Sequence, residues 1–118
     1  MYKFSNRSKR QLATVDIRLQ NLFNAVIKEY DVTILEGIRN IAKQKLYFDT
    51  GKSKTMNSYH LKGLAVDVAP YPIDWDNINR FMELSIIVKR IAKEQGLNIT
   101  WGGDWKWKDY PHYQINNS

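Results

Sequence analysis

Two short segments of the chain carry residue types that could hold a metal ion. The first runs from Ser58 to Asp67 and places an imidazole, His60, seven positions before the carboxylate of Asp67. The second contains the only other histidine of the sequence, His112, three positions after Asp109. A hydrolytic zinc site takes three protein ligands from His, Asp and Glu and leaves its fourth position to water. His60, Asp67 and His112 would supply two neutral imidazoles and one carboxylate, so the ion would keep a net positive charge that acidifies this water.

Asp109 supports the metal hypothesis because metal-assisted hydrolysis also needs a base. The base takes a proton from the activated water and returns it to the leaving group. Asp109 is joined to His112 through a tyrosine and a proline, and the proline ring stiffens this link. Simpler interpretations stay open. A lone histidine is more often a hydrogen-bonded or exposed side chain, and Asp109 could cap a turn before Pro111, a common role of aspartate.

The elements that must position these residues follow from hydrophobic periodicity and from turn residues. A capping-box pattern at Ser8–Gln11 followed by apolar residues at three- and four-residue spacings predicts the first helix. Helices are predicted over about residues 9–29, 40–48 and 76–95. Strands are predicted over residues 32–36, 64–69, 98–101 and 112–115. These elements predict one α+β domain over residues 1–118, with three helices packed on a small, mostly antiparallel sheet.

The composition is that of a globular domain with an excess of positive charge. Hydrophobic residues make up 43% and charged residues 25% of the chain, which argues against a disordered protein. The net charge of +6 predicts attraction to polyanions such as nucleic acid, anionic lipid or an acidic bacterial envelope. The basic residues are scattered without a long run, so we expect no nucleic-acid binding. The lack of cysteine excludes disulfides and thiolate metal sites.

Membrane insertion is not expected from the sequence. No apolar segment approaches the roughly 20 residues that cross a bilayer. The first residues also lack the apolar region of a signal peptide. We therefore expect synthesis in the cytoplasm without a signal peptide.

Three motifs follow one another along the chain. They are Ser58-x-His60-x-x-Gly63-x-Ala65-x-Asp67, Trp101-Gly102-Gly103-Asp104-Trp105 and Asp109-x-Pro111-His112-Tyr113. In this order the chain resembles the zinc L-alanyl-D-glutamate peptidases, phage endolysins within the wider D-alanyl-D-alanine carboxypeptidase (VanY-like) group. The resemblance extends upstream to Gly37-x-Arg39 and Gln44 and covers nearly all of the chain from about Ser8.

The resemblance implies a role for each matching residue. His60, Asp67 and His112 would bind zinc, and Asp109 would be the catalytic base. Arg39 would meet a carboxylate of the substrate or the developing oxyanion, because a guanidinium group presents a planar fork of donors.

Further residues of the motifs are expected near the substrate. Ser58 and Gln44 would orient the site or the substrate. Trp101 and Trp105 would wall a groove, although indoles more often close a core. Asp104 could accept a hydrogen bond from a ligand histidine.

The function implied by the resemblance is zinc-dependent hydrolysis of the L-alanyl-D-glutamate bond in the peptide stem of peptidoglycan. The fold would be similar to that of hedgehog and D,D-peptidase domains, and the protein would act as a monomer on the bacterial cell wall after release from the cytoplasm.

Three alternatives remain open. The first is a carboxypeptidase or dipeptidase that acts at the D-alanyl-D-alanine end. Such members are expected to carry glutamate where this sequence has Asp109. A wall-binding module that keeps zinc without catalysis would not need Asp109. A basic nucleic-acid binder would leave the ordered His and Asp pattern unexplained.

Overall fold

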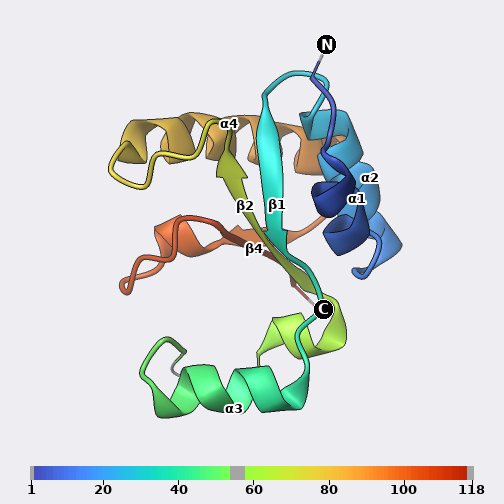
Figure 1. The fold of residues 1–118 in the computed structure, drawn as a ribbon. Helices are drawn as coiled ribbons and strands as arrows, with labels where there is room; N and C mark the ends of the chain where they lie inside the picture. The colour runs from blue at the N-terminus through green and yellow to red at the C-terminus, as the bar shows by residue number, and fades with distance from the viewer. Residues whose placement is uncertain (1, 54–57, 117–118) are drawn as a thin grey trace.

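The computed structural model describes residues 2–53 and 58–116, and a four-stranded antiparallel sheet forms its centre (Figure 1). The strands are β1 (Val32–Glu36), β2 (Ala65–Pro70), β3 (Ile99–Trp101) and β4 (His112–Ile115), in the order β1-β2-β4-β3 across the sheet. The helices of the described residues are α1 (Asn6–Leu12), α2 (Ile17–Val26), α3 (Ile41–Asp49) and α4 (Ile78–Glu94), with short 3-10 helices η1 (Tyr59–Lys62) and η2 (Gly102–Asp104). The predicted α+β class is confirmed. None of these helices combines the length and apolar composition of a membrane span.

One face of the sheet is packed against α2 and α4 and forms the core. Side chains alternate along a strand, so Val66 and Val68 of β2 and Tyr113 and Ile115 of β4 share this face, and all four are buried. They belong to one apolar cluster with helix residues Leu19, Leu22, Phe23, Val26, Phe81, Leu84, Val88 and Ile91. The same alternation leaves the polar residues of β2 and β4 on the opposite face of the sheet, where α3 and η1 lie (Figure 1).

The prediction of one helix over residues 9–29 is wrong, because the chain forms two helices, α1 and α2, separated by residues 13–16. Asp16 begins the second helix, and its side chain accepts a hydrogen bond from the backbone N–H of Arg18 at 2.9 Å. Leu12 and Leu19 both face the core across the break, so the apolar spacing continues while the helix does not. The other two predicted helices are confirmed as α3 and α4, which gives four helices rather than three.

Helix α1 covers the outer edge of strand β1 through hydrogen bonds. Ser8 was predicted to cap this helix, but the cap is Ser5, and Ser8 lies buried inside the helix. Oγ of Ser8 accepts a hydrogen bond from the backbone N–H of Ile34 at 3.0 Å. The guanidinium group of Arg7 donates to the carbonyls of Ile34 and Leu35, both at 3.2 Å. An open strand edge can pair with other chains, and these contacts close it within the molecule.

A β-bulge in β1 determines where Glu36 points. Ile34 pairs with Val68, but Glu36 pairs with Asp67, so Leu35 is an extra residue between the two pairs. In a regular strand Glu36 would share the core face with Ile34. The bulge instead places the Glu36 carboxylate on the same face as Asp67.

Replacing Ser8 by alanine tests the hydrogen bonds at this edge. Ser8→Ala should lower the free energy of unfolding by about 1–3 kcal/mol, because the buried N–H of Ile34 loses its acceptor. Urea titration followed by circular dichroism measures this loss. The matched control is Ser85→Ala, because the buried Ser85 hydroxyl donates to the carbonyl of Met82 within the same helix, α4. An equal loss in both variants would contradict a special role for the edge contact.

Candidate metal centre and active site

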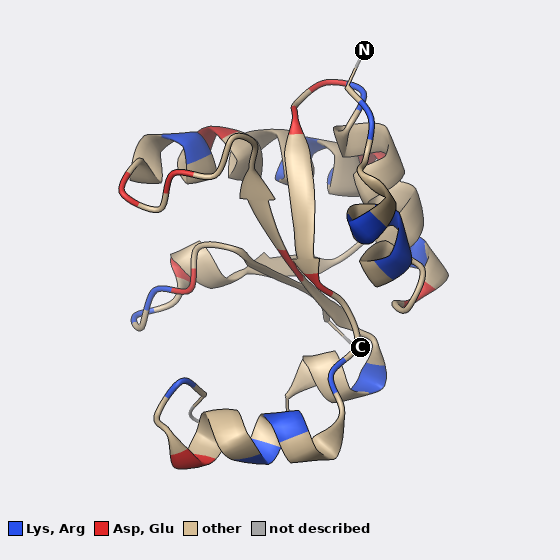
Figure 2. Cartoon of the chain, in the orientation of Figure 1, with Lys and Arg blue, Asp and Glu red and all other residues tan. Residues whose placement is uncertain are grey.

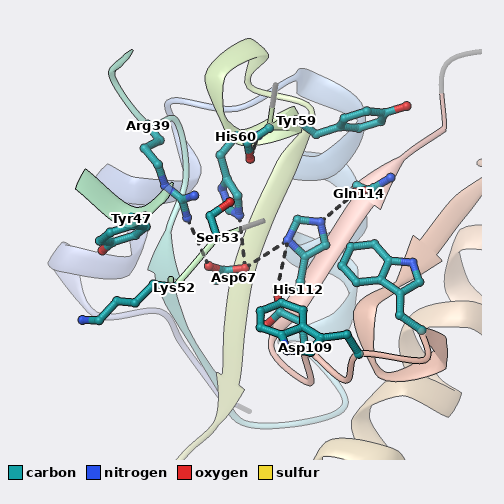
Figure 3. A pocket seen from close by; sticks show the side chains of 13 residues that line it. Arg39, Tyr47, Lys52, Ser53, Tyr59, His60, Asp67, Asp109, His112 and Gln114 are labelled. Atoms are coloured by element: carbon teal, nitrogen blue, oxygen red, sulfur yellow. Dashed lines mark hydrogen bonds and ion pairs between the residues drawn. The ribbon is translucent and has the colours of Figure 1, made fainter. Parts of the chain in front are cut away.

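Two paired strands and one short helix bring the three predicted metal ligands together. Asp67 of β2 and His112 of β4 are direct partners in the sheet, so their side chains lie on the same face. His60 belongs to η1, which leads the chain into β2. Oδ1 of Asp67 lies 3.2 Å from Nε2 of His60 and 3.4 Å from Nδ1 of His112. In Figure 3 both imidazoles point toward Asp67, and the candidate ligand atoms of the three residues all lie within 4.8 Å of one another.

The outer ring nitrogen of each histidine has its own acceptor. Nδ1 of His60 donates to the carbonyl of Gly37 at 2.9 Å, and Nε2 of His112 donates to Oε1 of Gln114 at 2.8 Å. Because both acceptors are oxygens without a proton, the neutral tautomers carry their protons on these outer nitrogens. Each inner nitrogen then directs a lone pair at the carboxylate of Asp67. Three acceptor atoms that face one another are stable only with a proton or a metal cation between them, so this donor set fits a metal ion.

The charge of Asp67 is strongly stabilised. Burial by itself would raise the pKa of Asp67, but hydrogen bonds and charges from His112 and His60 hold this pKa far below its ordinary value. Burial would lower the pKa of His112, and the hydrogen bond and charge of Asp67 raise it overall. The carboxylate is therefore an anionic ligand at any pH at which the protein would work.

Asp109 lies at the other side of the same centre. Its Oδ2 is 4.0 Å from Nδ1 of His112, and its side chain is partly exposed to the cavity described below. Burial, together with the charge of Asp67, raises the pKa of Asp109 above its ordinary value. A carboxylate with a raised pKa accepts a proton more readily, which suits a group that moves protons during hydrolysis.

The first glycine of η2, Gly102, allows the loop that contains Asp109 to lie close to the backbone of η2. The carbonyl of Gly102 accepts a hydrogen bond from the backbone N–H of Asp109 at 3.0 Å. A Cβ atom on Gly102 would lie 2.3 Å from the carbonyl oxygen of Asp109 and 3.1 Å from Cβ of His112. Any side chain at this position would push both residues out of place. The first glycine of the Trp-Gly-Gly-Asp-Trp motif therefore supports the site through the close approach of its backbone.

The two tryptophans of this motif have different surroundings. Trp101 is only 6% exposed, its Nε1 donates to the carbonyl of Tyr110 at 2.7 Å, and it belongs to the core. The prediction that Trp101 walls a substrate groove does not fit this placement, because β3 turns the indole toward the helices. Trp105 does line the cavity, and the centre of its ring system lies 5.0 Å from that of His112.

Asp104 does not reach the metal ligands. Its Oδ2 lies 2.7 Å from Nζ of Lys89, and the side chain of each residue is about half exposed. The hydrogen bond that Asp104 was expected to accept from a histidine is made instead by Gln114, two residues after His112. Alternation along β4 places these two residues on one face, which is the signal in the sequence that could have identified Gln114.

Arg39 lies beside Asp67 with most of its donors engaged. Nε donates to Oε1 of Glu36 at 2.9 Å, and Nη2 pairs with the same oxygen. Nη1 donates to Oε1 of Gln44 at 2.7 Å, while Nη2 lies 3.8 Å from Oδ2 of Asp67. Burial would raise the pKa of Glu36, but hydrogen bonds from Arg39 and Lys43 hold it below its ordinary value. Arg39 is thus a buried cation held between the carboxylates of Glu36 and Asp67.

Gln44 and Ser58, the other two residues predicted to orient the site, have different positions. Gln44 is fully buried behind Arg39, so it orients the guanidinium group rather than lining the cavity. The hydroxyl of Ser58 accepts a hydrogen bond from the backbone N–H of His60 at 3.2 Å and caps η1. Gly63 ends the same short helix at a φ of 69°, a left-handed conformation that favours glycine. The spacing from Ser58 to Gly63 therefore fixes the turn that carries His60.

A cavity of about 530 Å³ opens beside the three candidate ligands. Of the predicted substrate residues, Arg39, Ser58 and Trp105 line it, whereas Gln44 and Trp101 do not. The sequence motifs did not identify six further residues of its wall. These are Tyr47, Lys52, Ser53, Tyr59, Trp107 and Gln114. Tyr59 occupies an unspecified position of the first motif, and Tyr47, Lys52, Ser53 and Trp107 lie outside all three motifs.

The chain matches proteins of one family over nearly its whole length. Residues 1–117 match the family model of the phage L-alanyl-D-glutamate peptidases. The L-alanyl-D-glutamate peptidase of Escherichia phage T5 is 33% identical over 122 aligned positions, which cover 97% of this chain and 89% of that protein. The L-alanyl-D-glutamate peptidase of Listeria phage A118 is 36% identical over 95 positions, which cover 73% of this chain and 31% of that longer protein.

A solved structure supports the same assignment. The crystal structure of the Serratia marcescens L-Ala D-Glu endopeptidase ChiX superposes with a TM-score of 0.88 at 31% sequence identity. The match covers 97% of this chain and 90% of that one, so it includes the sheet, its helices and the face that carries the candidate site. By sequence and by fold, the chain belongs to the phage L-alanyl-D-glutamate peptidase family.

Proposed function

We propose that this protein hydrolyses the L-alanyl-D-glutamate bond in the peptide stem of peptidoglycan, with a zinc ion held by His60, Asp67 and His112. The observation that carries this proposal is the convergence of the three ligand atoms within 4.8 Å, beside a cavity that also contains Asp109. The names of the matched relatives support the choice of bond.

The donor set favours zinc over magnesium and calcium. Two imidazole nitrogens and one carboxylate are typical of catalytic zinc, whereas magnesium and calcium prefer oxygen ligands only. When bound, zinc would supply a Lewis acid that acidifies water and polarises the scissile carbonyl. Gly37 and Gln114 would fix the ring orientations through the outer nitrogens of the two histidines.

Asp109 would move the proton during the reaction. Its carboxylate lies on the cavity side of His112, and its pKa is raised by burial and by the charge of Asp67. It would accept a proton from the attacking water and pass it to the nitrogen of the leaving glutamate. Arg39 would keep Asp67 oriented and add positive charge to the floor of the cavity, where negative charge develops on the carbonyl oxygen.

Digestion of purified sacculi separates this proposal from the alternatives. Mass analysis of the products should show stem peptides that begin with glutamate, together with glycan strands that retain alanine. Release of the terminal D-alanine would identify a carboxypeptidase instead. Binding without any new product would identify a wall-binding module.

Replacing Asp109 by asparagine should lower kcat/KM by about 10²–10⁴-fold, because the amide cannot accept the proton. Zinc content and melting temperature should stay close to those of the parent, since the asparagine side chain fills the same volume. The matched control is Asp104→Asn, which removes an exposed charge paired with Lys89 and should keep full activity. Parental activity in Asp109→Asn would reject the assignment of the base.

Removal of the ion with a chelator should abolish hydrolysis, and added zinc should restore it. His60→Ala or His112→Ala should lose stoichiometric zinc, because each removes one of three ligands. Retention of one zinc per chain in either variant would reject this ligand set.

Gln114→Leu should weaken zinc binding by roughly 10–100-fold, because Nε2 of His112 loses its acceptor. Competition with a chromophoric chelator measures this affinity without reference to catalysis. Gln95→Leu, which alters an exposed glutamine after α4, is the control and should bind zinc as the parent does. Equal affinities in the parent and Gln114→Leu would contradict the positioning role of Gln114.

A further inference from the structure

The wall of the cavity beside α3 carries an exposed cation that the proposed mechanism does not use, Lys52. Its side chain lines the cavity together with Tyr47 of α3, and its Nζ lies 5.7 Å from the centre of the Tyr47 ring. Within residues 2–53 and 58–116, no carboxylate lies within ion-pair distance of this ammonium group. Figure 2 shows further basic positions on α3, but Lys43 is paired with Glu36 and Lys45 with Asp49, so Lys52 differs from them in having no carboxylate partner among the described residues.

Arg39, the other lysine or arginine of the described cavity wall, is poorly placed to take a new anion. Its Nε and Nη2 are occupied by Glu36, and its Nη1 donates to Gln44. The side chain is 7% exposed and already lies between two carboxylates. A substrate carboxylate that approached Arg39 would have to displace one of these partners or share its charge.

The substrate of the proposed reaction carries a negative charge next to the scissile bond. The amino group of this glutamate residue forms the scissile bond with alanine. Glutamate has two carboxyl groups, and the peptide continues through one of them, so the other is free. The other carboxyl group stays ionised at neutral pH, because its ordinary pKa is about 4. A cavity that binds this residue therefore has to accommodate an anion.

The charges of the cavity walls favour one side for this anion. In Figure 3 Lys52 and Tyr47 lie on one side of Asp67, and His112 and Asp109 lie on the other. Asp109 would repel a second carboxylate, whereas Lys52 would attract it. We propose that Lys52 binds the free carboxylate of the glutamate residue that follows the scissile bond. This inference rests on the proposed function and adds a determinant of substrate choice.

Tyr47 holds the lysine on this wall. Cations surround its ring, with the guanidinium carbon of Arg39 at 4.7 Å and Nζ of Lys43 at 5.5 Å from the ring centre. The ring therefore lies fixed between the buried Arg39 and the exposed Lys52, and its face attracts the lysine stem and ammonium group. A lysine restrained in this way loses less conformational entropy when it binds an anion.

Two synthetic stem peptides test the inference. They have the same sequence, but in the second the free carboxylate of glutamate is replaced by a carboxamide. The zinc-loaded full chain should cleave the carboxylate peptide with a kcat/KM roughly tenfold higher, mainly through a lower KM, because a charge-assisted hydrogen bond is lost in the amide. This preference should shrink as the salt concentration rises.

Variants of Lys52 test whether its ammonium group causes the preference for the carboxylate peptide. Lys52→Met should reduce cleavage of the carboxylate peptide to about the level of the carboxamide peptide and reduce cleavage of the carboxamide peptide much less, and Lys52→Arg should keep the preference. Lys28→Met removes one charge from an exposed lysine outside the cavity wall and should behave as the parent. Melting temperatures of all variants control for folding.

Two results would overturn the inference. One is equal cleavage of both peptides by the parent, and the other is an equal loss for both peptides in Lys52→Met. If the parent lyses sacculi but cuts neither peptide between alanine and glutamate, the proposed bond itself is wrong, and the inference is rejected with it.

Discussion

The partly buried carboxylate of Asp67 is the charge around which the rest of the site is arranged. A carboxylate in this position is stable only if cations or donors surround it. His60 reaches it from η1, His112 from β4 and Arg39 from the segment after β1. These three segments are distant in the sequence, and their common partner explains why they meet. The pKa of Asp67 lies far below its ordinary value because of the contacts with His112 and His60, which outweigh the effect of burial, so the carboxylate stays ionised.

Each side chain of the centre is held by a second set of contacts. The imidazoles are oriented by the carbonyl of Gly37 and the amide of Gln114, and Arg39 is oriented by Glu36 and Gln44. The backbone N–H of Arg39 also donates to the carbonyl of His60 at 2.9 Å, so the two segments fix each other. These contacts position the side chains of the site before a substrate arrives, and such preorganisation favours electrostatic stabilisation of a transition state.

The sequence was sufficient to predict the fold class, the strands and the three residues that converge, because these depend on local periodicity and on spaced motifs. The sequence was not sufficient to predict the break between α1 and α2, since the apolar spacing continues through residues 13–16. Nor did it reveal that Trp101 is a core residue while Trp105 lines the cavity. Both indoles flank the same glycines, but Trp101 ends strand β3, whereas Trp105 follows the short helix η2 and faces the cavity. The wall formed by Tyr47 and Lys52 depends on where the segment of α3 lies relative to the strands that carry the candidate ligands, which no local pattern encodes.

The bulge at Leu35 has a consequence for how this small protein can vary. Upstream of it, β1 is a structural strand whose residues serve the core and the contact with α1. Downstream, the same strand ends in a carboxylate that holds Arg39 on the face of the sheet that carries the candidate metal ligands. One inserted residue thus divides a five-residue strand into a part that contacts the core and a part that contacts the candidate site. Substitutions in the first part can change stability while the second keeps its geometry, so the two properties can evolve separately within one strand.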